Sequence, residues 1–307
     1  MKQLLAALAL ATLAAPTSAQ QGAPARAAAP PRTILFVGNS FTQGAHSAVR
    51  NWGATSVTDL VGAGYGGVPA LFKAFTEQAG LDYRVSLETQ GGRTLGFHYD
   101  ERRQLFDRAW DVVVLQELST LSRERPGDAT AYVRDVGRHT TLLRARNPNV
   151  RVELMATWSR ADQVYPAGGG DAGPWRGKPI AQMALDLRAA ADRARRDVPA
   201  VSGVLPVGEA WNRAFAEQVA DPNPYDGVSF GQVDLWAYDH YHGSIYGYYL
   251  EALVVFGRIT GIDPRTLGAK ERAADQLGIS DAQAVRLQEI ASAELRACGT
   301  RCGAAPR

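Results

Sequence analysis

Short apolar segments alternate with amphipathic segments along most of this chain. Apolar or alternating runs predict β-strands over residues 32–37, 83–89, 110–116, 149–156 and 203–207. Apolar residues at three- and four-residue spacing predict helices over 131–146, 180–196, 246–259 and 281–295, with Ser280 as the N-cap of the last. Gly38-Asn39-Ser40 ends the first strand, and we expect a helix to follow it.

Strands that alternate with helices are typical of a parallel sheet that is covered on both faces. No internal repeat and no change of composition within residues 32–296 indicates a second domain. The stretch 165–178 is rich in Gly and Pro, which predicts a surface insertion. In open α/β sheets, binding and catalytic groups gather at the carboxyl ends of the strands, so we expect the functional residues there.

The N-terminal region has the pattern of a signal peptide. Residues 1–19 combine a short basic start, an apolar Ala/Leu run and a small-residue ending, and we expect cleavage after Ala19. An ordinary N-terminal helix is the alternative. The apolar run is shorter than the roughly 20 residues that a membrane span needs. Residues 20–31 are rich in Ala, Pro and Gly and predict a flexible linker, so we expect a protein without a membrane span that is secreted or periplasmic.

Charge and cysteine content exclude several classes of protein. Lys and Arg total 33 against 31 Asp and Glu, which disfavours a nucleic-acid binder. Two cysteines exclude a disulfide-built scaffold and a four-cysteine zinc site. Cys298 and Cys302 can form a small disulfide loop or remain free thiols. The run Gly62-x-Gly64-x-x-Gly67 matches a dinucleotide fingerprint only formally, because no clear strand precedes it.

Three residues suggest nucleophilic catalysis. Ser40 follows a strand, where a helix N-terminus would supply N–H groups and partial positive charge for an oxyanion. A serine nucleophile needs a base, and the base needs an orienting carboxylate. Asp239 and His242 lie three residues apart and offer both from one segment. Each signal is weak when it is taken separately.

Taken together and in this order, the motifs resemble those of the SGNH (GDSL-like) hydrolases. Val37-Gly38-Asn39-Ser40-Phe41-Thr42 is similar to the first block of that family, and Asp239-x-x-His242-x-Ser244-x-x-Gly247 is similar to its last block. Gly92 stands where the second block has its glycine, Asp111 to Ser119 resembles the strand of the third block, and residues 206–211 resemble a segment common ahead of the last. The resemblance covers about residues 32–262. It implies a three-layer α/β/α sandwich with a mostly parallel, flavodoxin-like sheet.

The resemblance also assigns roles. Ser40 would be the nucleophile, His242 the general base and then acid, and Asp239 the residue that orients the imidazole. The oxyanion hole would consist of the backbone N–H groups of Ser40 and Gly92 and a side-chain amide. The family has that amide on an Asn that is missing here, so Gln116 is our substitute, with Ser119 as the other candidate. Gln116 can alternatively be a strand-end residue that caps backbone groups.

Several further residues are candidates with a structural alternative. Asn39, His98, Glu117, Ser119 and Trp158 are candidates for substrate binding. His98 can instead be a satisfied structural histidine, and Glu117 a solvated loop acid. Trp158, like Tyr165 and Trp175, flanks the Gly-rich insertion, where an aromatic ring either stacks on a sugar or anchors the insertion.

His240 competes with His242 as the base, although the Asp-x-x-His spacing favours His242. Asp239-His240-x-His242 also suggests a metal site, which we disfavour because no further carboxylate or cysteine cluster supports it.

The sequence therefore predicts a secreted serine esterase, a carboxylic ester hydrolase of SGNH type that forms an acyl-enzyme on Ser40. The expected substrate is a small-molecule or carbohydrate ester, with an acetyl group favoured, and we expect no cofactor and no metal. The alternatives are an O-acyltransferase with the same site and a non-catalytic glycan-binding protein. We expect residues 32–262 to form the catalytic domain and residues 263–307 to form a helical extension that packs on it. The sequence does not indicate an oligomeric state.

Overall fold

A computed structural model describes residues 30–169 and 173–304 of the chain. The predicted signal peptide and all but the last two residues of the predicted linker lie outside these ranges. Residues 31–307 group into one compact unit, and the following description concerns this unit. None of the helices in the two described ranges is long and apolar enough to cross a membrane.

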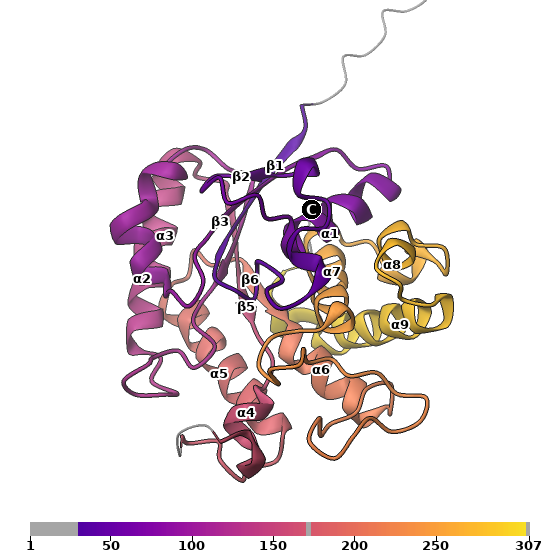
Figure 1. Cartoon of the computed structure of the whole chain (residues 1–307). Coiled ribbons are helices and arrows are strands. Elements are labelled where there is room, and N and C mark those ends of the chain that lie inside the picture. Colours follow the sequence, from indigo (N-terminus) through magenta and orange to yellow (C-terminus); the bar gives the residue numbers. More distant parts are fainter. Residues whose placement is uncertain (1–29, 170–172, 305–307) are drawn as a thin grey trace, which may run out of the picture. The chain divides into compact units, whose positions relative to one another are not determined.

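Six parallel strands form the centre of the fold (Figure 1). Their order is β2-β3-β1-β4-β5-β6. Without the edge strand β2, this order is that of the flavodoxin-like sheet, so the predicted parallel α/β architecture is confirmed. The strands are β1 (Arg32–Gly38), β2 (Thr58–Asp59), β3 (Tyr83–Thr89), β4 (Val112–Gln116), β5 (Arg151–Ala156) and β6 (Gly203–Pro206).

Both faces of the sheet are covered by helices. In β1, Ile34 and Phe36 point into one apolar core, while Leu35 and Val37 point into the other. Because both faces of the strand are buried, its sequence is continuously apolar rather than alternating. The face toward which Ile34 and Phe36 point is covered by α1 (Gly67–Gln78), α6 (Val207–Ala216), α7 (Ile245–Thr260), α8 (Arg272–Gln276) and α9 (Asp281–Cys298). The opposite face is covered by α2 (Leu95–Phe97), α3 (Thr130–Arg146) and α5 (Ala181–Asp197). Figure 1 shows the two helical layers on either side of the sheet.

The expectation of a helix directly after the first strand was wrong. Residues 40–46 form a series of turns instead. Gly44 and His46 have φ values of 69° and 62°, and this left-handed backbone cannot continue a right-handed helix. The helix on this side is α1, which begins only at Gly67. The Gly62-x-Gly64-x-x-Gly67 run therefore forms the turn between the two-residue edge strand β2 and α1.

The C-terminal helix α9 packs onto the sheet-covering helix α7. Helix α9 buries Leu287, Ile290 and Ala291 in the same apolar core as α7. Its N-terminus has the predicted cap at Ser280, which forms a capping box with Gln283. Residues 263–304 thus belong to the compact unit that contains the sheet.

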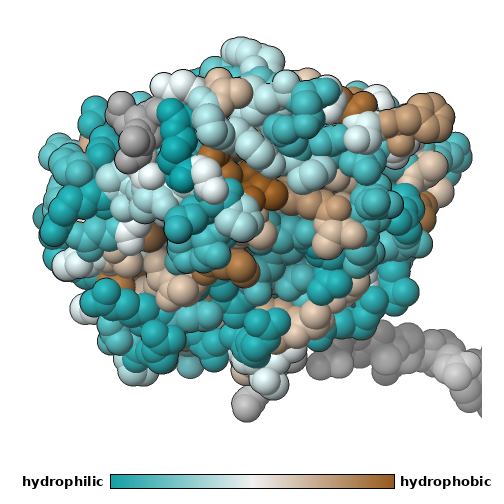
Figure 2. All heavy atoms as spheres, turned by 90° about the horizontal axis from the view of Figure 1, so that it is seen from below, coloured by the Kyte–Doolittle hydropathy of each residue, from teal (hydrophilic) through white to brown (hydrophobic). Residues whose placement is uncertain are grey.

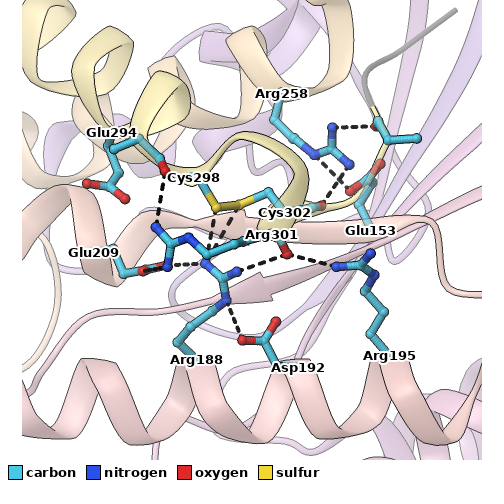
Figure 3. Close-up of a disulfide and its surroundings, with 12 residues drawn as sticks. Glu153, Arg188, Asp192, Arg195, Glu209, Arg258, Glu294, Cys298, Arg301 and Cys302 are labelled. Carbon is cyan, nitrogen blue, oxygen red and sulfur yellow. Dashed lines mark hydrogen bonds and ion pairs between the residues drawn. A yellow bond between two sulfur atoms is a disulfide. The ribbon is translucent and has the colours of Figure 1, made fainter.

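A disulfide and two buried arginines hold the last described residues against the sheet. Cys298 and Cys302 are disulfide-bonded at the end of α9 (Figure 3). Arg258 donates to the carbonyls of Cys302 and Ala304, at 2.8 Å each, and Arg188 donates to the sulfur of Cys298. Beyond the disulfide, Gly303 forms an antiparallel bridge with Gly203 of β6. The C-terminal segment therefore protects an edge strand that would otherwise expose unpaired backbone groups.

This arrangement predicts that both cysteines of the purified protein are oxidised. The disulfide closes a loop with a sequence separation of four residues, and so small a loop contributes about 2 kcal/mol by the chain-entropy relation. We expect no free thiol in the denatured, unreduced protein. A Cys298→Ala/Cys302→Ala variant should lose about 2 kcal/mol of unfolding free energy, measured by urea denaturation. Two titratable thiols, or an unchanged free energy of unfolding, would contradict the assignment.

Candidate functional site

Ser40 lies in a tight loop at the carboxyl end of β1. The N–H of Gln43 donates to the carbonyl of Asn39, and the N–H of Ala45 donates to the carbonyl of Ser40, each at 3.0 Å. From α7, the Tyr248 hydroxyl donates to the carbonyl of Ala45 at 3.0 Å. The loop is therefore closed on itself and fixed to the helical layer, which holds the half-buried Ser40 in one place.

The start of α1 supports the same loop from behind. The N–H of Val68 donates to the carbonyl of Thr42 at 3.1 Å. A Cβ added to Gly67 would lie 2.5 Å from that carbonyl oxygen, and φ is +61° at this position. Only glycine satisfies both constraints without strain, so α1 can approach the loop closely.

Asp239 and His242 lie on a turn that leads into α7. Trp236 and Gly243 pair as an antiparallel bridge, and Asp239 lies in the turn between them. One oxygen of Asp239, Oδ1, accepts the N–H groups of Tyr241 (3.2 Å) and His242 (3.0 Å). This Asx-type turn explains the three-residue spacing, because it brings the second carboxylate oxygen to the His242 ring.

The serine, histidine and aspartate form one continuous hydrogen-bonded chain. His242 Nδ1 lies 2.6 Å from Asp239 Oδ2, and His242 Nε2 lies 2.9 Å from Ser40 Oγ. A carboxylate beside Nδ1 favours the proton on that nitrogen, which leaves the Nε2 lone pair to accept the hydroxyl proton of Ser40. Burial raises the pKa of Asp239, but the hydrogen bonds from the His242 ring and backbone outweigh burial, and the net pKa falls below its ordinary value. Asp239 is therefore anionic beside the imidazole.

Aromatic packing holds the imidazole in this position. Phe41 stacks on Trp158 with ring centroids 4.1 Å apart, and its edge meets the His242 ring at 5.6 Å. Trp158 stacks on Trp211 behind it and has no exposed surface. Trp158 therefore anchors the floor of the site, and a ring without exposed surface does not fit the sugar-stacking role considered for it. Trp175 is also buried.

Two backbone N–H groups in the loops after β1 and β3 have no acceptor within the described ranges. Among the described residues, no hydrogen-bond acceptor contacts the N–H of Ser40 or the N–H of Gly92. Gly92 has φ +67° in the loop that follows β3. Two bonds tie this loop to the serine loop: Gln90 N–H donates to the Gly38 carbonyl at 3.1 Å, and Asn39 Nδ2 donates to the Arg93 carbonyl at 3.1 Å.

Gln116 and Asn39 tie the strand ends together. The Gln116 side chain is fully buried, and its Oε1 accepts the N–H of Asn39 (2.9 Å) and the hydroxyl of Thr42 (3.1 Å). Its amide nitrogen donates to the carbonyl of Glu117. The amide is thus occupied by loop contacts rather than free for an oxyanion, an arrangement that fits the alternative of capping backbone groups. The amide nitrogen of Asn39 likewise donates to the carbonyls of Arg93 and Glu117 and is not free to bind a substrate.

Glu117, His98 and Ser119, the remaining candidates for substrate binding, are buried. Glu117 accepts the N–H groups of Leu95 and Leu118. Burial raises the pKa of Glu117 to about 8, although these two N–H groups lower it in part. It is a buried residue, not a solvated loop acid. His98 has no exposed surface, and its Nδ1 lies 2.6 Å from Glu88 Oε2, whereas its Nε2 is buried with no partner among the described residues, so this histidine is structural but only half satisfied.

Ser119 is also buried, and its hydroxyl accepts a hydrogen bond from Arg160 at 3.3 Å. His240 is separate from the hydrogen-bonded chain, since its ring packs on Tyr225 at 4.4 Å.

Two residues near the triad, His46 and Tyr238, were not predicted from the sequence. His46 ends the serine loop, and its ring stacks on His242 with centroids 4.4 Å apart. Its Nδ1 lies 2.7 Å from the hydroxyl of the exposed Tyr238. His46 belongs to no recognisable motif. It lies 196 residues from His242 along the chain, so the sequence does not indicate their contact. Its position six residues after Ser40 is the only sequence signal.

Figure 2 views the molecule from the end toward which the strands run in Figure 1. This face is mostly hydrophilic, with a small group of hydrophobic side chains near its middle. It therefore differs from the broad apolar mouth that would suit long acyl chains.

Comparison with known proteins gives structural but no sequence relatives. No protein-family model matches the chain, and no curated protein matches it by sequence. A crystal structure of a DUF4886 family protein from Bacteroides uniformis superposes with a TM-score of 0.59 and 18% identity, covering 87% of this chain and 95% of that one.

Two further solved structures are similar at lower scores. A candidate SGNH hydrolase from Slackia heliotrinireducens has a TM-score of 0.49 and 21% identity, over 74% of this chain and 98% of that one. The acetyl xylan esterase AlAXEase has a TM-score of 0.48 and 16% identity, over 73% and 98%. Of these three likenesses, the first is strong enough to show a shared fold, and at 18% identity it shows the fold alone. The chain therefore has the parallel α/β/α sandwich fold of the DUF4886 family protein.

Proposed function

We propose that this protein is a serine esterase of SGNH type. The observation that carries the proposal is the hydrogen-bonded chain from Ser40 Oγ through His242 to Asp239, with distances of 2.9 and 2.6 Å. A hydroxyl, a neutral imidazole and a carboxylate in this order are the groups that acyl transfer to water requires.

The reaction would proceed in two halves. Ser40 Oγ attacks the ester carbonyl carbon while its proton passes to His242 Nε2. The tetrahedral intermediate collapses, the alcohol leaves with the proton from His242, and the acyl group remains on Ser40. Water then attacks the acyl-enzyme, gives a proton to His242 and releases the acid as Ser40 recovers its proton. Asp239 stabilises the imidazolium that exists in each half.

The oxyanion hole would consist of the backbone N–H groups of Ser40 and Gly92. Their lack of an acceptor supports this assignment, as does the tie between their loops through Asn39. Gln116 would act as a positioning residue, because its Oε1 holds the N–H of Asn39 and the hydroxyl of Thr42 on either side of Ser40. Two preorganised donors supply part of the stabilisation that three would give.

We infer the substrate class from the face of the molecule at the carboxyl ends of the strands. The hydrophilic face in Figure 2 supports a short acyl group, such as acetyl, on a polar alcohol such as a carbohydrate.

Export from the cytoplasm is supported by the disulfide, because such bonds persist in oxidising compartments, and by the signal-peptide pattern of residues 1–19.

Hydrolysis of p-nitrophenyl acetate tests the triad. Ser40→Ala and His242→Asn should each lower kcat by on the order of 10³-fold or more, since the chain of proton transfer is broken. His240→Asn is the matched control: it makes the same replacement two residues away, at a left-handed position (φ 52°) that Asn tolerates, and should retain activity. Equal turnover by Ser40→Ala, or loss of turnover in His240→Asn but not in His242→Asn, would refute the assignment.

Substitution of two adjacent glycines, Gly91 and Gly92, tests the proposed oxyanion hole. Gly92→Ala puts a side chain on a left-handed residue (φ +67°), so we expect relaxation of the strained backbone to move the Gly92 N–H, while the exposed Arg123 guanidinium, 2.8 Å from the new Cβ, can move aside. We expect kcat to fall about tenfold or more with little change in KM, because the donor acts mainly in the transition state. Gly91→Ala is the control, because its Cβ approaches Gln43 Oε1 only to 3.8 Å and its φ is not left-handed. If both variants were equally active, the Gly92 N–H would not be a donor.

A further inference from the structure

His46 lies against the proposed triad, but the reaction described above does not use it. Its ring stacks on the His242 ring at an interplanar angle of 29°. Its Nε2 lies 3.9 Å from Asp239 Oδ2, the same oxygen that faces His242 Nδ1. Two imidazoles therefore flank one carboxylate oxygen.

The donor atoms of this cluster are held in place by other contacts. The Tyr238 hydroxyl engages His46 Nδ1 at 2.7 Å, which turns Nε2 toward Asp239. Two backbone N–H groups hold Asp239 Oδ1, so Oδ2 is the oxygen that faces both rings. Metal-binding histidines are oriented in the same way, through a hydrogen bond at the nitrogen that does not bind the metal.

The backbone at His46 indicates that this orientation is imposed. A φ of 62° is unfavourable for a non-glycine residue, by about 1 kcal/mol or more, and such strain persists where the surroundings determine it. Strained residues are frequent at functional sites.

The cluster also has dimensions that suit a metal ion. One donor atom each from His46, Asp239 and His242 lies within 4.8 Å of the other two. Tetrahedral zinc, with bonds of about 2.0–2.1 Å, separates its ligand atoms by roughly 3.3 Å. Asp239 Oδ2 lies 2.6 Å from one ring nitrogen and 3.9 Å from the other, on either side of that value, and the donor atoms lie no more than 4.8 Å apart, so the two rings would have to rotate toward a common ion to close the site. The His46 and Asp239 side chains are 39% and 23% exposed, which gives an ion access.

We propose that His46, Asp239 and His242 bind a divalent transition-metal ion of the Zn²⁺ type, and that this ion inhibits the esterase. Two imidazoles and one carboxylate favour Zn²⁺, Cu²⁺ or Ni²⁺ over Mg²⁺ and Ca²⁺, which prefer oxygen ligands. An ion on Asp239 and His242 would displace the hydrogen bond that orients the imidazole and would prevent His242 from accepting the Ser40 proton. The binding claim rests on geometry alone, whereas the inhibition rests on the proposed function.

This site differs from the metal site that the sequence suggested. That motif combined Asp239 with His240 and His242, but the His240 ring packs on Tyr225 and is not part of the cluster. His46, from the serine loop, takes its place. The ion proposed here opposes the reaction and does not take part in it.

Calorimetric titration of Zn²⁺ into the chelator-treated protein tests the binding. We expect one ion per chain and no comparable binding of Mg²⁺. His46→Ala should weaken Zn²⁺ binding at least tenfold, and Tyr238→Phe, which removes only the orienting hydroxyl, about tenfold. His240→Asn is the matched control and should bind like the unaltered protein. Circular dichroism establishes that each variant is folded, and Tyr238→Phe at the exposed surface provides the test if His46→Ala does not fold. Equal affinity of a folded His46→Ala or Tyr238→Phe variant and the unaltered protein would overturn the site.

Hydrolysis of p-nitrophenyl acetate separates this inference from the proposed function. Inhibition by Zn²⁺ at the concentrations that saturate the calorimetric site, with recovery on adding EDTA, would support both. His46-dependent binding to a metal-free protein without esterase activity would support the site and refute the esterase. An active enzyme that neither binds Zn²⁺ through His46 nor loses activity to it would refute the metal site and leave the esterase intact.

Discussion

Two hydrogen bonds on one imidazole ring join the distant parts of this site. His242 connects to Ser40, 202 residues earlier in the chain, and to Asp239, three residues earlier. For both bonds to exist, the loop after β1 and the turn before α7 must meet at one end of the sheet. The parallel sheet meets that requirement, because it ends its strands at a common edge and lets the helices of one face pack beside them. The Tyr248 hydroxyl then connects α7 directly to the serine loop.

Buried amides, more than the helical dipole we expected, support the serine. No helix begins at Ser40, and the helix that meets this loop, α1, begins at Gly67 and donates the Val68 N–H to the carbonyl of Thr42 rather than to the serine. Gln116 and Asn39 tie the ends of β1, β3 and β4 together instead, through hydrogen bonds to Asn39, Arg93 and Glu117. A buried polar network of this kind is rigid when its members are satisfied. The N–H groups of Ser40 and Gly92 have no acceptor within this network, and for that reason we propose them as the donors for the developing negative charge.

The elements that the sequence predicts well are those whose signal is local. The continuous apolar run of β4 and the amphipathic spacing of α3 and α5 appear close to their expected bounds, because burial acts on every residue of these segments. The Asp-x-x-His spacing is also local, since an Asx turn spans four residues. The two-residue strand β2 and the left-handed turn at His46 leave no periodic signal, so both were missed. The roles of Gln116 and Trp158 depend on neighbours far along the chain, such as Asn39 and Trp211, and a single sequence does not show those contacts.

In the proposed mechanism, His242 makes Ser40 a nucleophile. A fluorophosphonate probe forms a stable adduct only with such an activated hydroxyl, and its site can be located by peptide mass spectrometry of the chelator-treated protein. We expect a single adduct on the peptide that contains Ser40, which is absent in Ser40→Ala and forms far more slowly in His242→Asn. Labelling that survives Ser40→Ala, or a folded protein that the probe does not label at all, would contradict this mechanism.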